Sequence, residues 1–285
     1  MPRLALSTRS LGLLLSLLVL AACSRIELVY RNLDWLIPWR LDNYLSLDTG
    51  QSAWLDARLD EHLRWHCSSE LPRYIDWLER HRVLLAGNPD AGQLVGPMGE
   101  ARALLQASLR HVAADGTELL TGLSAAQIAE LDQRLSAERT RLSEQHLVGS
   151  LEQRLQRRAT RMERRLEDWL GPLHPLQRAY LRLWATRQEA NVQPWLAWRE
   201  RWQAQLLDSL RQPRSDQLAA RLEPLLGNPE RYWDDDYRRA VNRAQRGLAE
   251  LFSELWASAT PAQRAHLQHR LDAVRTDLDG LVCGS

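Results

Sequence analysis

Apolar side chains recur at every third or fourth position along most of the chain, and no segment alternates apolar and polar residues. Because an α-helix turns once in about 3.6 residues, this spacing predicts an all-α fold, a bundle of long amphipathic helices joined by short capped turns. The clearest stripe predicts one long helix over 139–170 and consists of Leu142, Leu147, Leu151, Leu155, Met162, Leu166 and Trp169. Further helices are expected near 28–46, 49–68, 70–86, 98–114, 124–148, 174–190, 192–211, 214–226, 235–258 and 261–281.

The starts of several expected helices carry a recurring signal, a glutamine three residues after a residue that begins a helix. The pairs are Asp48 and Gln51, Ser124 and Gln127, His174 and Gln177, and Thr260 and Gln263. Where the first residue is Asp, Ser or Thr, the pattern is a capping box, in which each side chain binds the other residue's backbone N–H. The pairs are irregularly spaced, so they do not predict a solenoid.

Proline and glycine mark the expected breaks between helices. Pro38 lies inside the first expected helix and should kink it. Glycine and proline are concentrated over 87–99, which is therefore the longest predicted loop. We treat this loop as a candidate hinge within one helical domain spanning 23–285.

The first 22 residues follow a different pattern. Arg3 and Arg9 accompany an apolar run over 11–20, which is shorter than the roughly 20 residues that a membrane-spanning helix needs. The run ends in Leu-Ala-Ala-Cys at 20–23, which resembles the lipobox of bacterial lipoproteins. We therefore expect a signal peptide at 1–22 and a lipid-bearing Cys23 as the first mature residue. The alternative is an ordinary signal peptide followed by an unrelated cysteine.

The resemblance to lipoproteins also implies a location. Their mature cysteine carries fatty acyl chains such as palmitate, and two or more chains are enough for stable anchoring. Ser24 stands where an aspartate would favour retention in the inner membrane. The expectation is therefore an outer-membrane protein that is anchored by its lipid and faces the periplasm.

Composition excludes several classes of protein. The 37 basic residues are all arginine and are balanced by 36 acidic ones, which argues against nucleic acid as a partner. Without lysine, neither a P-loop nor a Schiff-base mechanism can operate. The motifs Gly-x-Ser-x-Gly, Cys-x-x-Cys and Gly-x-Gly-x-x-Gly are also absent. The sequence therefore predicts no cofactor and no catalytic residues.

Two histidines are weak candidates for a metal site. His62 and His66 are four residues apart on an expected helix, so both could face one ion, and His81 could approach from the next helix. The spacing fixes no third ligand. The alternative, which we favour, is that one or both histidines pack against Trp65 and pair with Glu70 or Asp60.

Five arginines share one helix face beside the apolar stripe: Arg154, Arg157, Arg158, Arg161 and Arg165. Such a face could contact anionic lipid head groups or an acidic partner. The alternative, which we favour, is a solvated face that is balanced by Glu152, Glu163 and Glu167 through pairs along the helix.

Tryptophan is unusually frequent, with 12 residues against one phenylalanine. Trp195, Trp198 and Trp202 line one face of an expected helix. Helical spacing favours packing in the core. An exposed strip would instead indicate a peptide groove or a membrane-facing surface.

Once Cys23 carries lipid, the remaining thiols are Cys67 and Cys283. In an oxidising periplasm these two could form a disulfide that ties the C-terminus to an early helix. The alternative is two unpaired cysteines.

The segment around Trp65 and Tyr74 predicts a structural corner between two helices. Ser68 or Ser69 would cap the second helix, and proline fits its first turn. At the end of the first helix, the dipole would favour a positively charged His66.

The N-terminal third resembles an uncharacterised family of proteobacterial lipoproteins, which implies a helical lipoprotein without known catalytic residues. The residues that carry this resemblance are the Tyr-Arg-Asn-Leu-Asp-Trp-Leu segment at 30–36, Asp42, Tyr44, Trp65, His66 and the Glu-Leu-Pro-Arg-Tyr segment at 70–74. Cys67 departs from it. A second, weaker resemblance, at 47–51 and 123–127, is to small helical periplasmic chaperones with repeated Leu-Thr-x-x-Gln.

Taken together, the sequence predicts a lipid-anchored, non-enzymatic interaction or envelope-structure protein whose partner is an unidentified envelope protein. One alternative is a chaperone-like binder of unfolded periplasmic proteins, which an exposed apolar concavity would favour. The other is a metal-dependent enzyme, which a third ligand converging on His62 and His66 would favour.

Overall fold

The computed structural model describes residues 25–212 and 217–283. Helices account for nearly all of these residues, and no strand occurs among them. The predicted all-α fold is therefore confirmed. The expected signal peptide and Cys23 lie outside the described residues.

The first half of the chain forms a short N-terminal helix pair followed by longer helices. Its helices are α2 (Arg25–Tyr30), α3 (Leu33–Leu41), α4 (Thr49–Trp65), the π-helical turn η1 (His66–Glu70), α5 (Leu71–Ala86), α6 (Ala91–Thr121) and α7 (Ala125–Leu147). Pro38 lies inside α3, and Asn32 separates α3 from α2.

The second half continues with helices of similar length. They are α8 (Leu151–Leu170), α9 (Pro175–Gln188), the 3-10 turn η2 (Glu189–Asn191), α10 (Val192–Arg211), α11 (Gln217–Gly227), the 3-10 turn η3 (Pro229–Tyr232), α12 (Asp235–Ala257) and α13 (Pro261–Asp279).

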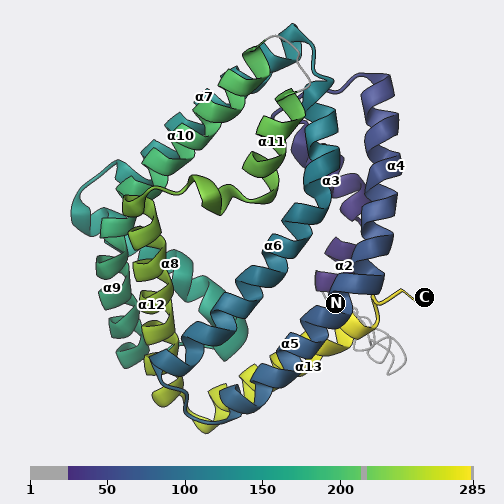
Figure 1. Ribbon diagram of the computed structural model, residues 1–285. Helices are drawn as coiled ribbons and strands as arrows, with labels where there is room; N and C mark the ends of the chain where they lie inside the picture. Colours follow the sequence, from purple (N-terminus) through teal and green to yellow (C-terminus); the bar gives the residue numbers. More distant parts are fainter. Residues whose placement is uncertain (1–24, 213–216, 284–285) are drawn as a thin grey trace, which may run out of the picture.

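The helices lie along the sides of a roughly four-sided frame that α6 crosses (Figure 1). One side pairs α7 with α10, and another pairs α5 with α13. The long helix α6 packs against α11 and α12. Segments far apart in sequence therefore hold the frame together.

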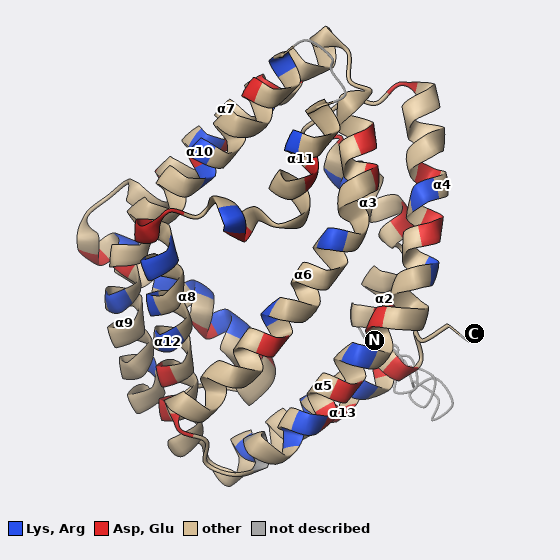
Figure 2. Ribbon diagram, in the orientation of Figure 1, with Lys and Arg blue, Asp and Glu red and all other residues tan. Residues whose placement is uncertain are grey.

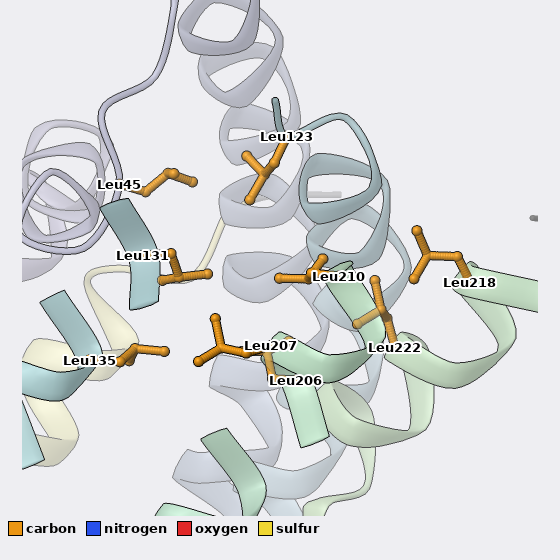
Figure 3. Packing of buried hydrophobic residues seen from close by; sticks show 9 residues of the cluster. All are labelled: Leu45, Leu123, Leu131, Leu135, Leu206, Leu207, Leu210, Leu218 and Leu222. Atoms are coloured by element: carbon orange, nitrogen blue, oxygen red, sulfur yellow. The ribbon is translucent and has the colours of Figure 1, made fainter. Parts of the chain in front are cut away.

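The described core consists of separate clusters instead of one continuous interior. Figure 3 shows the cluster that joins α7, α10 and α11, which contains Leu45, Leu123, Leu131, Leu135, Leu206, Leu207, Leu210, Leu218 and Leu222. A second joins α8, α9 and α12 around Leu181 and Leu251. A third surrounds Cys67 and Leu71, where the end of α13 meets the bend between α4 and α5.

The single long helix expected over 139–170 is wrong. The chain breaks after Leu147, where Gly149 adopts a positive φ of 94°, a conformation that glycine accepts readily. Ser150 then begins α8 with its own capping box to Gln153. The apolar period continues through the break, so periodicity alone did not reveal it.

The loop expected over 87–99 is also shorter than predicted. Only residues 87–90 separate α5 from α6, because Asp90 forms a capping box with Gln93 and begins α6 there. Pro97 lies inside that helix. The hinge proposed for this region stays a prediction.

The expected corner at 65–74 has a different construction. The chain does not stop between α4 and α5 but continues through the π-helical turn η1, and Figure 1 shows the change of direction there. Neither Ser68 nor Ser69 caps α5; the Ser68 hydroxyl donates to Arg64 O, at 2.9 Å. In a π turn the backbone bonds span five residues instead of four, as from Leu71 N to His66 O, and such turns are a known cause of helix bends.

The four glutamines of the recurring sequence signal meet in pairs. The amides of Gln51 and Gln127 donate to each other's Oε1, at 3.3 and 2.6 Å. Those of Gln177 and Gln263 do the same, at 3.1 and 2.9 Å, and Gln177 is fully buried. Each glutamine therefore caps the first turn of its own helix and also binds the glutamine in the first turn of another helix.

We predict that Gln263→Ala destabilises the protein by about 1–3 kcal/mol, because it leaves the buried amide of Gln177 without its partner. The matched control is Gln153→Ala, since Gln153 belongs to an exposed capping box with no second glutamine. Its loss should stay below about 1 kcal/mol. Urea denaturation measures both; equal losses would contradict the role assigned to the pair.

Candidate functional site

The two cysteines remaining in the body of the chain form a disulfide. Cys67 in η1 and Cys283 beyond α13 are bonded, with their Cα atoms 5.2 Å apart. The bridge lies in the apolar cluster with Leu71 and Leu281. It joins positions 216 residues apart and so links the segment after α13 to the bend between α4 and α5.

The two candidate metal ligands do not converge. His62 Nε2 lies 2.8 Å from Asp115 Oδ2, whereas His66 points to two tyrosines. His81 pairs with Glu100 at 3.1 Å and does not approach either. Among the described residues, no group of three His, Cys, Asp or Glu side chains is placed to hold a metal ion.

His66 belongs to a hydrogen-bonded chain at the bend. Its Nδ1 lies 3.0 Å from the Tyr30 hydroxyl and its Nε2 3.3 Å from that of Tyr74, which in turn lies 2.9 Å from Ser108 Oγ. Burial lowers the pKa of His66 despite the opposing charge of Glu70. Burial therefore opposes the positively charged imidazolium that was expected at this position.

The arginine-rich face of α8 is only partly neutralised, and by an unexpected residue. Glu189 in η2 accepts from Arg154 at 2.8 Å and lies 2.9 Å from Arg158, which also donates to Ala185 O. Burial raises the pKa of Glu189, but the two arginines outweigh burial and hold it below its ordinary value.

The glutamates that were expected to balance this face are engaged elsewhere. Glu163 accepts from Arg178 of α9 at 2.5 Å, and Glu167 lies 3.8 Å from the same arginine. The interpretation of the face as one balanced by pairs along α8 is therefore wrong for these two. Figure 2 shows the basic residues gathered on α8.

From Arg158 onward, the arginine-rich face of α8 lines a cavity of about 430 Å³ between α7, α8, the η2 region and α12. The polar and aromatic residues of its wall are Gln145, His146, Arg158, Arg161, Arg165, Trp184, Gln188, Asn191, Trp195 and Tyr237. No acidic side chain is among the described residues that line it. The sequence indicated the arginines but not the rest of the wall, which comes from α7, α9, η2, α10 and α12.

The electrostatic field in this cavity is positive. Burial, followed by the charges of neighbouring arginines, lowers the pKa of Arg161. Burial and the charges of Arg161, Arg158 and Arg157 likewise lower the pKa of His146, and only Glu189 opposes them. The arrangement is suited to binding a negatively charged group and offers no nucleophile positioned beside a base.

The three tryptophans on one face of α10 lie in three different environments. Trp202 packs against the leucine core and donates to Leu225 O at 3.0 Å. Trp198 stacks on Tyr237, with ring centroids 4.6 Å apart. Trp195 lines the cavity and contacts His146 edge-on. The strip is therefore neither wholly core nor an exposed groove.

A second hollow, of about 360 Å³, lies between α3, α4 and α6. Its wall is mostly apolar and includes Leu33, Ile37, Trp54, Leu55, Leu59, Leu63, Trp65, Val112 and Leu119. Val112 is 37% exposed, and Leu105 and Leu109 on the same helix are 62% and 45% exposed. An exposed apolar concavity is therefore present.

The short helices α2 and α3 also expose large apolar side chains. Leu28 is 68% exposed and Val29 51%. Trp35 and Trp39 are 60% and 54% exposed, and their rings stack 5.9 Å apart. Among the described residues, no helix combines the length and apolar composition needed to cross a bilayer.

These features define an all-helical frame that includes an arginine-lined cavity and an apolar hollow between α3, α4 and α6. The chain belongs to DUF6279, a family of unknown function whose model matches residues 43–238. The expectation of an uncharacterised family is confirmed, and the match carries no information about a lipid anchor. No curated protein and no solved structure matches the chain.

We predict that the free energy of unfolding falls as the pH is lowered from about 7 to 5. The pKa values of His66, His111 and His146 are lowered in the folded protein. Unfolded histidines titrate near pH 6.5, so the unfolded chain takes up protons first as the pH falls. The stability that these histidines contribute is fully present above the unfolded pKa and is lost as the pH falls through the lower folded pKa values.

Urea denaturation at several pH values measures this dependence. His66→Gln should flatten the slope, whereas the control His269→Gln, at an exposed position, should leave it unchanged. A stability that is constant or rises between pH 7 and 5 would contradict the prediction.

Proposed function

We propose that this protein is a lipoprotein, anchored through acylated Cys23 to the periplasmic face of the outer membrane, where its helical frame binds a protein partner without catalysis. The main observation in support of membrane anchoring is the exposed apolar surface of α2 and α3. The first of these helices begins two residues after Cys23. Tryptophans and aliphatic side chains suit the interface between lipid and water.

The disulfide supports the proposed periplasmic location. Disulfides persist in the periplasm and are rare in the reducing cytosol. A bridge between Cys67 and Cys283 therefore agrees with export, as does the signal-like segment over 1–22.

We predict that Cys23→Ser releases the protein from membranes into the soluble periplasmic fraction, because the acyl chains contribute most of the anchoring energy. Cell fractionation followed by immunoblotting measures the distribution. The control is Cys67→Ser combined with Cys283→Ser, which should leave any folded protein membrane-bound. A Cys23→Ser protein that stays with the membranes would contradict lipid anchoring.

The role of α2 and α3 is tested in the background of Cys23→Ser, with vesicles of outer-membrane-like phospholipid. Trp35→Ser together with Trp39→Ser should reduce the residual binding. The matched control is Leu105→Ser with Leu109→Ser, which removes a similar exposed apolar surface from α6. Equal binding by both double variants would contradict a membrane-facing α2–α3.

The apolar hollow supports the interaction function, and it also favours a second candidate. Exposed concave apolar surfaces mark sites where proteins or ligands bind. A binder of one envelope partner and a chaperone for unfolded proteins both need such a surface. They differ in how many clients the surface accepts.

A photo-crosslinking amino acid at Val112 distinguishes the two candidates, with Val83 of α5, 79% exposed, as the matched position outside the hollow. We predict one discrete adduct from Val112 in intact cells and none from Val83. Many adducts that increase with heat stress would favour the chaperone. Adducts that are the same at both positions would contradict a binding role for the hollow.

A further inference from the structure

We propose that the cavity between α7, α8, η2 and α12 binds a small organic anion, a carboxylate or phosphate attached to an apolar body. The inference concerns a different surface from the membrane anchor and the apolar hollow, so it does not depend on the function proposed above. It rests on charge, on an unused donor, and on the shape and composition of the wall.

The first observation is uncompensated positive charge. Arg161 and Arg165 lie one helical turn apart on α8 and both line the cavity. Within the described chain, neither has a carboxylate within ion-pairing distance, whereas Arg154 and Arg158 share Glu189. Two guanidinium groups at a cavity wall without a counterion are suited to an external oxyanion, which each can bind with two parallel N–H groups.

The second observation is an unused hydrogen-bond donor. Trp184 forms part of the wall, and its indole N–H is buried without a partner in the described structure. Leaving such a donor unpaired is unfavourable, and the indole can only donate. The nitrogen has almost no accessible surface, so a ligand oxygen can accept from it only if the indole ring shifts toward the cavity.

The third observation concerns the rest of the wall. Trp195, Tyr237, Met162 and Val192 present apolar surface beside the arginines. A volume of about 430 Å³ falls within the range of small-molecule sites, roughly 300–1,000 Å³. The wall therefore fits a ligand with both an anionic group and an apolar or planar body better than it fits a bare inorganic ion.

The lining also derives from an irregular element. The 3-10 turn η2 separates α9 from α10 and places Asn191 at the cavity, where its amide donates to Gln188 Oε1 at 2.8 Å. The same turn provides Glu189, whose carboxylate is held by Arg154 and Arg158. The local acidic group is thereby kept away from Arg161 and Arg165.

The test uses purified protein and ligand-observed NMR with three probes: benzoate, phenyl phosphate and uncharged benzyl alcohol. Binding of at least one anionic probe should be detectable and stronger than binding of benzyl alcohol. Arg161→Gln should weaken it about tenfold or more, the loss expected for one charge-assisted hydrogen-bond pair. The matched control is Arg164→Gln, an exposed arginine on the same helix that does not line the cavity.

Equal weakening by Arg161→Gln and Arg164→Gln would overturn the proposal, because it would indicate only the general charge of α8. Equal binding of benzyl alcohol and both anions, or no binding of either anion, would also overturn it. Arg165→Gln is a second variant at a more exposed position and should weaken binding in the same direction.

Thermal stability separates binding from a structural role. Because Arg161 lies among like charges and lacks a partner, Arg161→Gln should melt no lower than Arg164→Gln. A melting temperature clearly below that of the control would assign Arg161 to the fold instead and would overturn its role as a ligand-binding residue.

Discussion

The arrangement of the helices depends on two reciprocal glutamine pairs. In each pair, both amides use their complete hydrogen-bonding capacity. Gln263 Oε1 accepts from Thr260 N and from Gln177, while its Nε2 donates to Pro172 O and to Gln177. Gln177 repeats this pattern with His174 N and Leu255 O. Gln51 and Gln127 do the same with Asp48 N and Gly122 O, and with Ser124 N and Ser46 O. The first of these pairs is buried and the second is partly buried. An amide with every donor and acceptor filled favours one relative placement of two helix starts, which rigidifies a frame without a continuous core.

The two pairs also relate the two halves of the chain. One joins the starts of α4 and α7, the other the starts of α9 and α13. In each half the first helix continues through an irregular turn, π-helical at η1 and 3-10 at η2, into a second helix. The last helix of each half packs on the second helix of the other: α7 on α10 and α13 on α5. The recurring capping signal thus marks equivalent positions in a chain that is folded as two interlocked, related halves, although its spacing along the sequence is irregular.

Much of the helical content followed from apolar periodicity, and the paired capping residues located α4, α7 and α13 to within a residue. The breaks were harder to predict where the apolar period continued through them, as at Gly149 and Ser150, or where a helix tolerated Pro97.

The cavity could not be predicted from the sequence, for a different reason. The five arginines were visible on one helix face, but the 3.6-residue period identifies a face without identifying what faces it. Local pairs along α8 were assumed, whereas Glu163 is held by Arg178 and the compensating carboxylate, Glu189, comes from the turn after α9. Long-range ion pairs of this kind require the tertiary fold.

The two irregular turns show where the halves differ in chemistry. At η1 the segment after α13 brings Cys283, which is cross-linked to Cys67, and His66 is hydrogen-bonded to Tyr30 and Tyr74. At η2 the end of α7 arrives with His146 instead, and the space beside it is a cavity with arginines on its wall. Glu189 pairs with Arg154 and Arg158, whereas Arg161 and Arg165, farther along α8, have no carboxylate within ion-pairing distance among the described residues. Equivalent positions in the frame are therefore cross-linked by a disulfide in one half and lined by arginines in the other. Arg161 is partly buried among like charges, so a bound anion at the second position would relieve a repulsion that the protein's own carboxylates do not.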